Sequence, residues 1–253
     1  MDILYPLSMR VAKATLAGTD EVDLDPFTGR RHRRVAVISE PFPHLVVDDF
    51  FTAEAYRTLC AGFDTAMRQG FSETIGGRRF HRFEVDYDGY VHTLVPSAEA
   101  SNPFALFFSL EWNRFFSRIF GVTTGFETTA ALHHHPSGDR TGYVHNDDAD
   151  KPFSRKGRLA NGVIWSAAGP DARPCRRKLA LLYFLENDGW REGDGGETAL
   201  YAADAKTLVK KVAPINNRLL AFRIGPNSMH AFQENRAERN AVVQWFHCPP
   251  EYA

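Results

Sequence analysis

The sequence predicts a mainly β protein, a sandwich or barrel of short strands, with helices flanking it on the N-terminal side. From Glu127 onward, short runs of β-branched and aromatic residues alternate with clusters of Gly, Pro, Asp and Asn. This alternation is typical of an all-β domain. Before Glu127, two segments repeat their apolar residues every three or four positions. Such spacing indicates helices with one apolar face packed on the β core.

The individual elements can be placed from local signals. Leu45–Val47 is a short β-branched run that predicts a strand, and Thr52 can cap a helix that starts at Ala53. A second helix is expected from Pro103 to Ile119, with an aromatic stripe that packs against a sheet. The strands expected in the C-terminal half are 128–135, 178–185, 218–224 and 240–247.

The chain of 253 residues, 43% of them hydrophobic, is expected to form a single domain over residues 1–253. Residues 1–40 are an N-terminal arm, 41–126 provide the helical support and first strands, and 127–248 form the β core. Within that core, residues 151–177 are a polar, basic insertion that is long for a connection. It is either a solvated loop or a lid that recognises the substrate.

Charge and cysteine content exclude several classes of protein. A formal net charge of -1 gives no reason to expect nucleic acid or an anionic membrane as a partner. The three dispersed cysteines form no disulfide framework or zinc–thiolate site. No apolar run reaches the ~18 residues of a membrane span, and the N-terminus lacks a signal-peptide pattern. We expect a soluble, cytoplasmic protein; its oligomeric state is open, and a homodimer is compatible with the sequence.

Three potential metal ligands stand out. His145 and Asp147 form an H-x-D pair, and residues two apart in a strand point to the same face. His230 follows a later strand-like run and completes a face of two histidines and one carboxylate. Such a face leaves coordination positions open and suits non-haem Fe(II). The same three side chains could instead hold zinc with a nucleophilic water, as in a hydrolase.

Arg239 distinguishes these two readings. It lies nine residues after His230, at the start of an expected strand. A buried guanidinium is costly unless a carboxylate pairs with it, and its planar fork suits the distal carboxylate of a dicarboxylic acid. Strand alternation puts three apolar side chains on the same face: Ala241, Val243 and Trp245. A zinc hydrolase leaves this arginine unexplained.

Taken in order, these motifs resemble the 2-oxoglutarate/Fe(II) oxygenase superfamily, in its prolyl-4-hydroxylase-like branch, and most of all the EGL-nine-type prolyl hydroxylases. The matching pieces are Thr141–Val144 before the H-x-D pair, Leu182–Leu185, Gly195–Thr198, Arg218–Leu220, His230 and Arg239. The resemblance implies a double-stranded β-helix (jelly-roll, cupin-like) core. It also implies Fe(II) on His145, Asp147 and His230, 2-oxoglutarate as co-substrate on Arg239, O2, and ascorbate as a candidate reductant.

The implied activity is hydroxylation of an unactivated C–H bond, in a prolyl or other residue of a protein. A free amino acid or a small natural-product intermediate is the alternative substrate, and a ligand-sensing jelly roll without turnover is a further alternative. Since related halogenases replace the carboxylate ligand with a small residue, the retained Asp147 predicts a hydroxylase.

The co-substrate pocket departs from the family pattern at three positions. A tyrosine that often contacts 2-oxoglutarate falls on Phe184, so that contact is either missing or supplied by neighbouring Tyr183. A second tyrosine position falls on His135, which is expected to line the pocket, and a threonine position falls on Val243. These three departures concern contacts to the co-substrate and leave the metal ligands unaffected.

Overall fold

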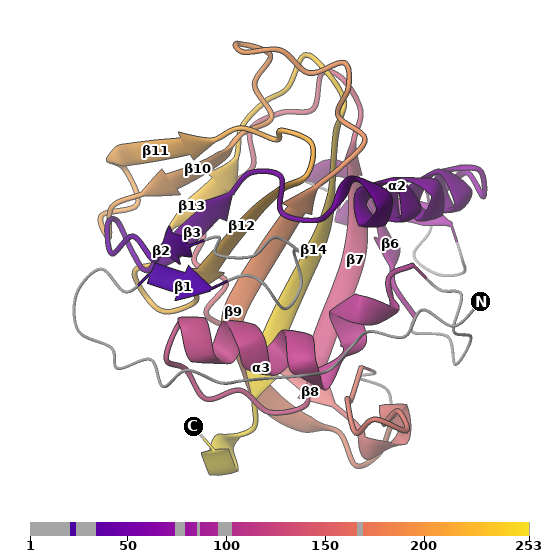
Figure 1. Ribbon diagram of the computed structural model, residues 1–253, viewed down its shortest axis with the longest axis vertical. Coiled ribbons are helices and arrows are strands. Elements are labelled where there is room, and N and C mark those ends of the chain that lie inside the picture. Colours follow the sequence, from indigo (N-terminus) through magenta and orange to yellow (C-terminus); the bar gives the residue numbers. More distant parts are fainter. Residues whose placement is uncertain are drawn as a thin grey trace.

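The computed structural model describes residues 21–23, 34–73, 79–84, 87–95, 103–165 and 169–252. In this part of the chain, a nine-stranded sheet has the order β3-β12-β9-β14-β7-β6-β5-β4, with β8 paired to β9 (Figure 1). Its strands are β3 (His44–Val47), β4 (Phe71–Ser72), β5 (Phe80–Glu84), β6 (Tyr87–Thr93), β7 (Thr128–His135), β8 (Asp150–Phe153), β9 (Arg173–Phe184), β12 (Arg218–Arg223) and β14 (Arg239–Cys248). The neighbouring strands pair antiparallel, except β4 with β5.

A second, three-stranded sheet has the order β11-β10-β13 and packs on one face of the large sheet. Its strands are β10 (Thr198–Tyr201), β11 (Leu208–Val212) and β13 (His230–Phe232). Leu200 and Val212 from this sheet join one apolar cluster with side chains of β9, β12 and β14. We call the face of the large sheet that carries this cluster the inner face. The prediction of a mainly β core with flanking helices is confirmed.

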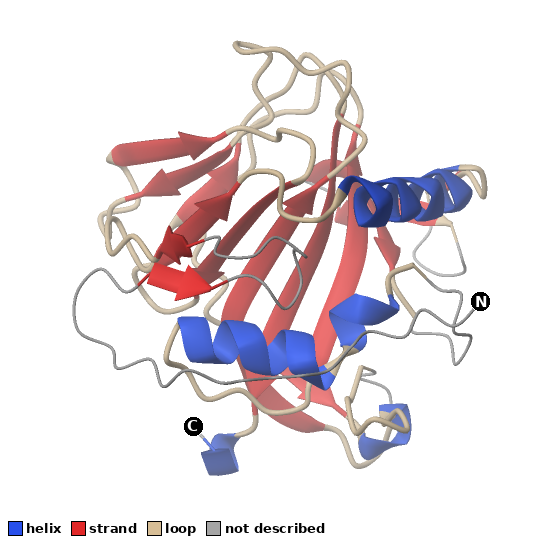
Figure 2. Cartoon of the chain, viewed as in Figure 1, coloured by secondary structure: helices blue, strands red, loops and turns tan. Residues whose placement is uncertain are grey.

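Two helices cover the opposite face of the large sheet (Figure 2). Helix α2 (Ala53–Met67) begins where the sequence predicts, because the Thr52 hydroxyl accepts a hydrogen bond from the Ala55 amide. Helix α3 (Leu110–Ile119) carries the aromatic stripe, and its Trp112 indole donates to Gln244 of β14 over 2.8 Å. None of the described helices is long and apolar enough to cross a membrane.

The prediction of one helix from Pro103 to Ile119 is wrong. The segment is a 3-10 helix, η1 (Ala105–Phe108), followed by α3, with Ser109 between them in an extended conformation. The Ser109 hydroxyl accepts a hydrogen bond from the Trp112 amide. A serine in this role starts a new helix, and the apolar periodicity continues across the break and conceals it.

The segment 151–177 has regular structure at both ends. Strand β8 pairs with β9 so that Lys151 lies opposite Cys175 and Phe153 lies opposite Arg173. This pairing extends β9 back to Arg173, five residues before the expected start of the strand. A 3-10 turn, η2 (Arg155–Gly157), follows β8, and η3 (Pro250–Tyr252) follows β14.

The predicted arm of residues 1–40 lies in part outside the described residues. Of the described part, β1 (Glu21–Asp23) pairs with β2 (Arg34–Ala36).

Candidate active site and metal centre

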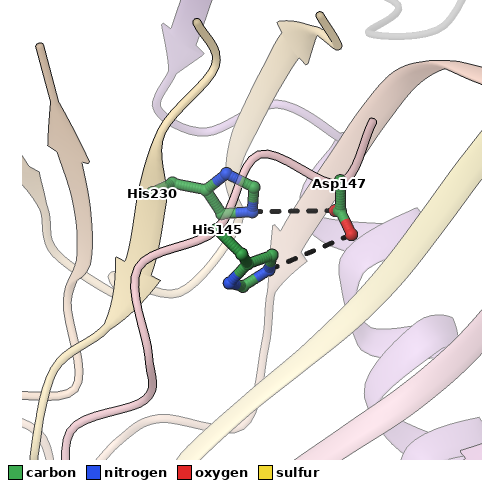
Figure 3. Close-up of side chains that lie close together, drawn as sticks. All are labelled: His145, Asp147 and His230. Carbon is green, nitrogen blue, oxygen red and sulfur yellow. Dashed lines mark ion pairs between the residues drawn. The ribbon is translucent and has the colours of Figure 1, made fainter. Parts of the chain in front are cut away.

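The three predicted ligands lie together, with both imidazole rings facing the carboxylate of Asp147 (Figure 3). His145 Nε2 is 3.9 Å from Asp147 Oδ1, and His230 Nε2 is 3.6 Å from Asp147 Oδ2. Among the residues that the structure describes, this is the one group of histidine, cysteine and acidic side chains close enough to share a metal ion.

A short backbone bridge brings His145 beside His230. The His145 amide donates to the His230 carbonyl over 3.0 Å, and the His230 amide donates back over 2.8 Å. The H-x-D pair is therefore not on a regular strand as expected, because Asp147 has φ of 61° and turns the chain. Aspartate adopts this left-handed conformation more readily than most residues, since its short polar side chain can bond locally.

Both histidines present Nε2 as the ligand atom. His145 Nδ1 donates to the Tyr143 carbonyl over 3.0 Å, and His230 Nδ1 donates to the Ser228 carbonyl over 2.8 Å. A carbonyl only accepts, so Nδ1 carries the proton and the lone pair of Nε2 points inward. Burial and the proximity of His230 lower the pKa of His145, which favours the neutral imidazole that a metal requires.

This donor set fits a divalent ion. Nitrogen and oxygen ligands lie about 2.0–2.2 Å from such an ion, so two ligand atoms on one ion are at most about 4.2 Å apart. The two histidine–aspartate separations, each to a different oxygen of the carboxylate, are below that limit, and one ligand atom from each residue lies within 4.8 Å of the others. Iron(II) would be held by His145, Asp147 and His230.

Two neighbours orient the Asp147 carboxylate. Arg177 Nη1 donates to Oδ1, and Trp245 Nε1 donates to Oδ2 over 2.8 Å. The Arg177 guanidinium also lies over the Trp245 ring, 4.7 Å from its centroid. Burial acts to raise the pKa of Asp147, but the contacts with His230, Arg177 and His145 outweigh it, so the pKa is lowered and the carboxylate stays ionised.

Arg177 was not predicted as a site residue, and Trp245 was expected in the sleeve around the co-substrate. The structure places the indole N–H of Trp245 on the metal ligand Asp147. Arg177 is thirty residues from Asp147 in sequence. Their contact can therefore be predicted only when the strand register is known.

Arg239 lies buried on the inner face, among aromatic rings. Its guanidinium is 5.1 Å from the ring centroid of Phe184 and 5.6 Å from that of Phe232, and Nη2 donates to Thr198 Oγ1 over 3.4 Å. Phe232 and the ligand His230 lie two residues apart on one face of β13, about 7 Å along the strand. The ring that contacts the Arg239 guanidinium thus shares its strand face with a metal ligand.

His135 and Val243 line the inner face near Arg239. His135 pairs with Arg239 in the β7–β14 register, stacks on Phe232 with ring centroids 4.0 Å apart, and contacts Asp139 Oδ2 through Nδ1 over 3.0 Å. Val243 joins the inner apolar cluster. Their part in a co-substrate pocket stays a prediction.

Tyr183 does not lie on the inner face with Arg239. Its hydroxyl donates to Asn217 Oδ1 over 2.9 Å, and its ring packs against Phe51 on the helix-covered face of the sheet. Its neighbour Phe184 takes the inner face instead. Neighbouring residues of a strand point to opposite faces of the sheet. The expectation that Tyr183 supplies a co-substrate contact is therefore wrong.

Comparison with known proteins agrees with this site. Residues 131–247 match the model of the 2OG-Fe(II) oxygenase superfamily. This match covers 117 of the 253 residues, and two curated proteins that are similar to part of the chain are prolyl hydroxylases.

Two curated relatives are similar over part of the chain. One is the prolyl 3,4-dihydroxylase OGFOD1 of Ostreococcus tauri, which is 33% identical over 28% of this chain and 16% of its own length. The other is the prolyl 3-hydroxylase 2 of Mus musculus, which is 36% identical over 33% of this chain and 11% of its own length. The similar part thus spans less than a fifth of either relative.

Solved structures show the same fold. A prolyl-4-hydroxylase of Pseudomonas putida has a TM-score of 0.56 and 17% identity, over 81% of this chain and 92% of its own. A prolyl hydroxylase of Trichoplax adhaerens, solved with a hypoxia inducible factor peptide, has a TM-score of 0.56 and 19% identity, over 81% of this chain and 83% of its own. The predicted jelly-roll core and the family resemblance are confirmed.

Proposed function

We propose that this protein is an Fe(II)- and 2-oxoglutarate-dependent dioxygenase that hydroxylates an unactivated C–H bond in a prolyl or other residue of a protein. The observation that carries the proposal is the shared inner face: a metal triad at one end and Arg239, caged by Phe184 and Phe232, at the other. The prolyl hydroxylases among its relatives support the class of substrate.

Each residue of the site has a defined part in this function. His145, Asp147 and His230 would hold the iron, which with 2-oxoglutarate and oxygen supplies the oxidising chemistry for C–H hydroxylation. Arg239 binds the distal carboxylate of the co-substrate and so fixes which end faces the triad. The apolar side chains around Arg239 keep water from competing for its guanidinium.

Other functions account for less of the site. A zinc hydrolase would use the same triad, but the buried arginine would have no partner in the reaction. Hydroxylation of a free amino acid or a small natural product uses the same machinery and differs only in the substrate. A sensing protein without turnover would bind 2-oxoglutarate and release no succinate.

The test is a substrate screen with the purified chain. Proline-containing peptides, cell-extract proteins and free amino acids are incubated with Fe(II) and 2-oxoglutarate, with and without ascorbate. We expect succinate release together with a gain of one oxygen in the substrate. Hydrolytic activity of a zinc-loaded protein without any response to 2-oxoglutarate would contradict the proposal.

Variants of two aspartates complete the test. Asp147→Ala should abolish succinate formation. The control is Asp150→Ala, which removes an exposed carboxylate that pairs with Arg176 and should leave succinate formation intact. Circular dichroism of both variants checks that the fold is intact. Normal turnover in Asp147→Ala would rule out this ligand set.

A further inference from the structure

The inner face extends past the metal triad to a second group of basic side chains. The pairing of β14 with β9 shifts by one residue between Phe246 and His247, so that His247 lies opposite Arg177. In an antiparallel sheet, opposite residues point to the same side, as do residues two apart in one strand. His247 therefore shares the inner face with Trp245, and Arg177 lies on it as well.

Lys151 lies on the same face. It is opposite Cys175 in the pairing of β8 with β9, and Cys175 is two residues before Arg177. Burial and the nearby Arg177 lower the pKa of Lys151, and burial, Arg177 and Lys151 lower that of His247 to about 3. The strand pairings and these mutual effects together bring Lys151, Arg177 and His247 close to one another on the inner face.

The two cations in this group have binding capacity left over. No hydrogen bond or ion pair joins the Lys151 ammonium to another residue in the described ranges, from 21–23 through 169–252. Arg177 uses Nη1 on Asp147, while its Nε is buried without a partner among the described residues. A partly buried cation with no counter-charge is unfavourable, so an anion is expected to complete the group.

Two acidic residues of the described chain that lie near this group are already paired elsewhere. Asp147 is committed to Arg177, Trp245 and the metal. Asp150 lies opposite Arg176 on the other face of the sheet, and Arg176 also binds Asp148 over 2.8 Å.

We propose that Lys151, together with Arg177, binds a carboxylate of the substrate next to the C–H bond that is hydroxylated. This inference rests on the proposed function and restricts its substrates to those with a carboxylate near the reacting C–H bond. The carboxylate belongs either to an acidic side chain that flanks the target residue in a peptide or to the α-carboxylate of a free amino acid. Arg177 thereby joins the substrate to the metal ligand Asp147.

Binding of a simple anion tests the site without turnover. Inorganic sulfate is titrated calorimetrically into the protein loaded with Mn(II) and 2-oxoglutarate under argon, so that the co-substrate already occupies Arg239. A lost charge-assisted hydrogen bond weakens binding by about tenfold or more. We expect this loss in Lys151→Gln, recovery in Lys151→Arg, and native affinity in the control Lys156→Gln, which changes an exposed lysine of η2. Equal sulfate affinities for the native protein and Lys151→Gln would overturn the proposal.

Turnover then identifies the source of the carboxylate. Peptides with aspartate or asparagine on either side of the target residue are compared, as are a free amino acid and its amide. The native protein should show a KM about tenfold lower for the acidic member of one pair, and Lys151→Gln should lose that preference. A preference for the acidic member that persists in Lys151→Gln would contradict the inference, whereas absence of any turnover would count against the proposed function and leave the sulfate result intact.

Discussion

Asp147 is the residue on which the metal site depends most. Two donors, Arg177 and Trp245, each hold one oxygen of its carboxylate, and its backbone adopts a left-handed conformation. The carboxylate is thus fixed in place by its neighbours, so less ordering is needed when a metal binds. This support explains how a ligand outside any regular strand can be held accurately.

The hydrogen bond from the Trp245 indole to Asp147 can be removed while the packing of the aromatic ring is kept. Trp245→Phe keeps an aromatic ring under Arg177 but removes the donor to Asp147 Oδ2. We expect metal affinity to fall by about 10–100-fold, as is typical when a group that orients a ligand is lost. Competition with a Mn(II) chelator measures this. Trp190→Phe, which removes an indole donor to the Gly195 carbonyl, is the control and should bind metal normally.

Arg239 is the second residue with a direct prediction. Arg239→Lys keeps the charge but loses the planar fork, so the KM for 2-oxoglutarate should rise by about tenfold or more. The exposed Arg236→Lys serves as the control. An unchanged KM in Arg239→Lys would show that the distal carboxylate binds elsewhere.

Sequence patterns predicted the metal ligands but misplaced Tyr183. Residues 179–185 are buried on both faces of the sheet, between the helices and the small sheet. A strand buried on both sides has no polar face, so its alternation cannot show which residue points inward. Tyr183 and Phe184 could be assigned to their faces only from the register with neighbouring strands.

At the scale of elements, a single shift in register arranges the proposed substrate side of the site. The irregularity between Phe246 and His247 keeps both His247 and Arg177 on the inner face. Bulges of this kind redirect side chains and are common beside active sites. No local feature of the sequence marks this one, and for that reason Arg177 was not among the predicted residues.

The break before α3 provides a prediction about stability. Ser109→Ala removes the hydroxyl that caps the helix, and the free energy of unfolding should fall by about 1 kcal/mol. Urea denaturation of the metal-free protein measures the change. Thr65→Ala, at an exposed position inside α2, should change stability by no more than about 0.5 kcal/mol. A similar effect for both variants would mean that the Ser109 cap contributes nothing specific.

At the scale of the whole molecule, the buried histidines tie stability to pH. Burial lowers the pKa of His44, His133 and His247, in the last case to about 3, from a value of 6.5 in an unfolded chain. Between these values the unfolded chain binds more protons than the folded one. Stability is therefore greatest above pH 6.5 and decreases as pH falls toward 3.

Urea midpoints of the metal-free protein at about pH 7.5 and pH 5 test this dependence. The midpoint should be lower at the acidic pH, and His247→Leu should make the difference smaller because one titrating group is removed. Identical midpoints for the native protein at both values would contradict the prediction.

At this scale, the sequence showed the order of the ligand motifs along the chain, from His145 through His230 to Arg239. Their meeting in space depends on strands that pair over long separations, such as β7 with β14. Spacing alone does not give these pairings, which the structure supplies.

The segment between β8 and β9 leaves and rejoins the sheet at two residues that face each other, Phe153 and Arg173. A connection anchored in this way can change in length at little thermodynamic cost, since loop closure depends only weakly on length. It begins two residues after Lys151, beside the proposed substrate site, and it contains none of the three metal ligands. Descendants of this protein could therefore exchange this segment and acquire new targets while their oxidative chemistry stayed the same.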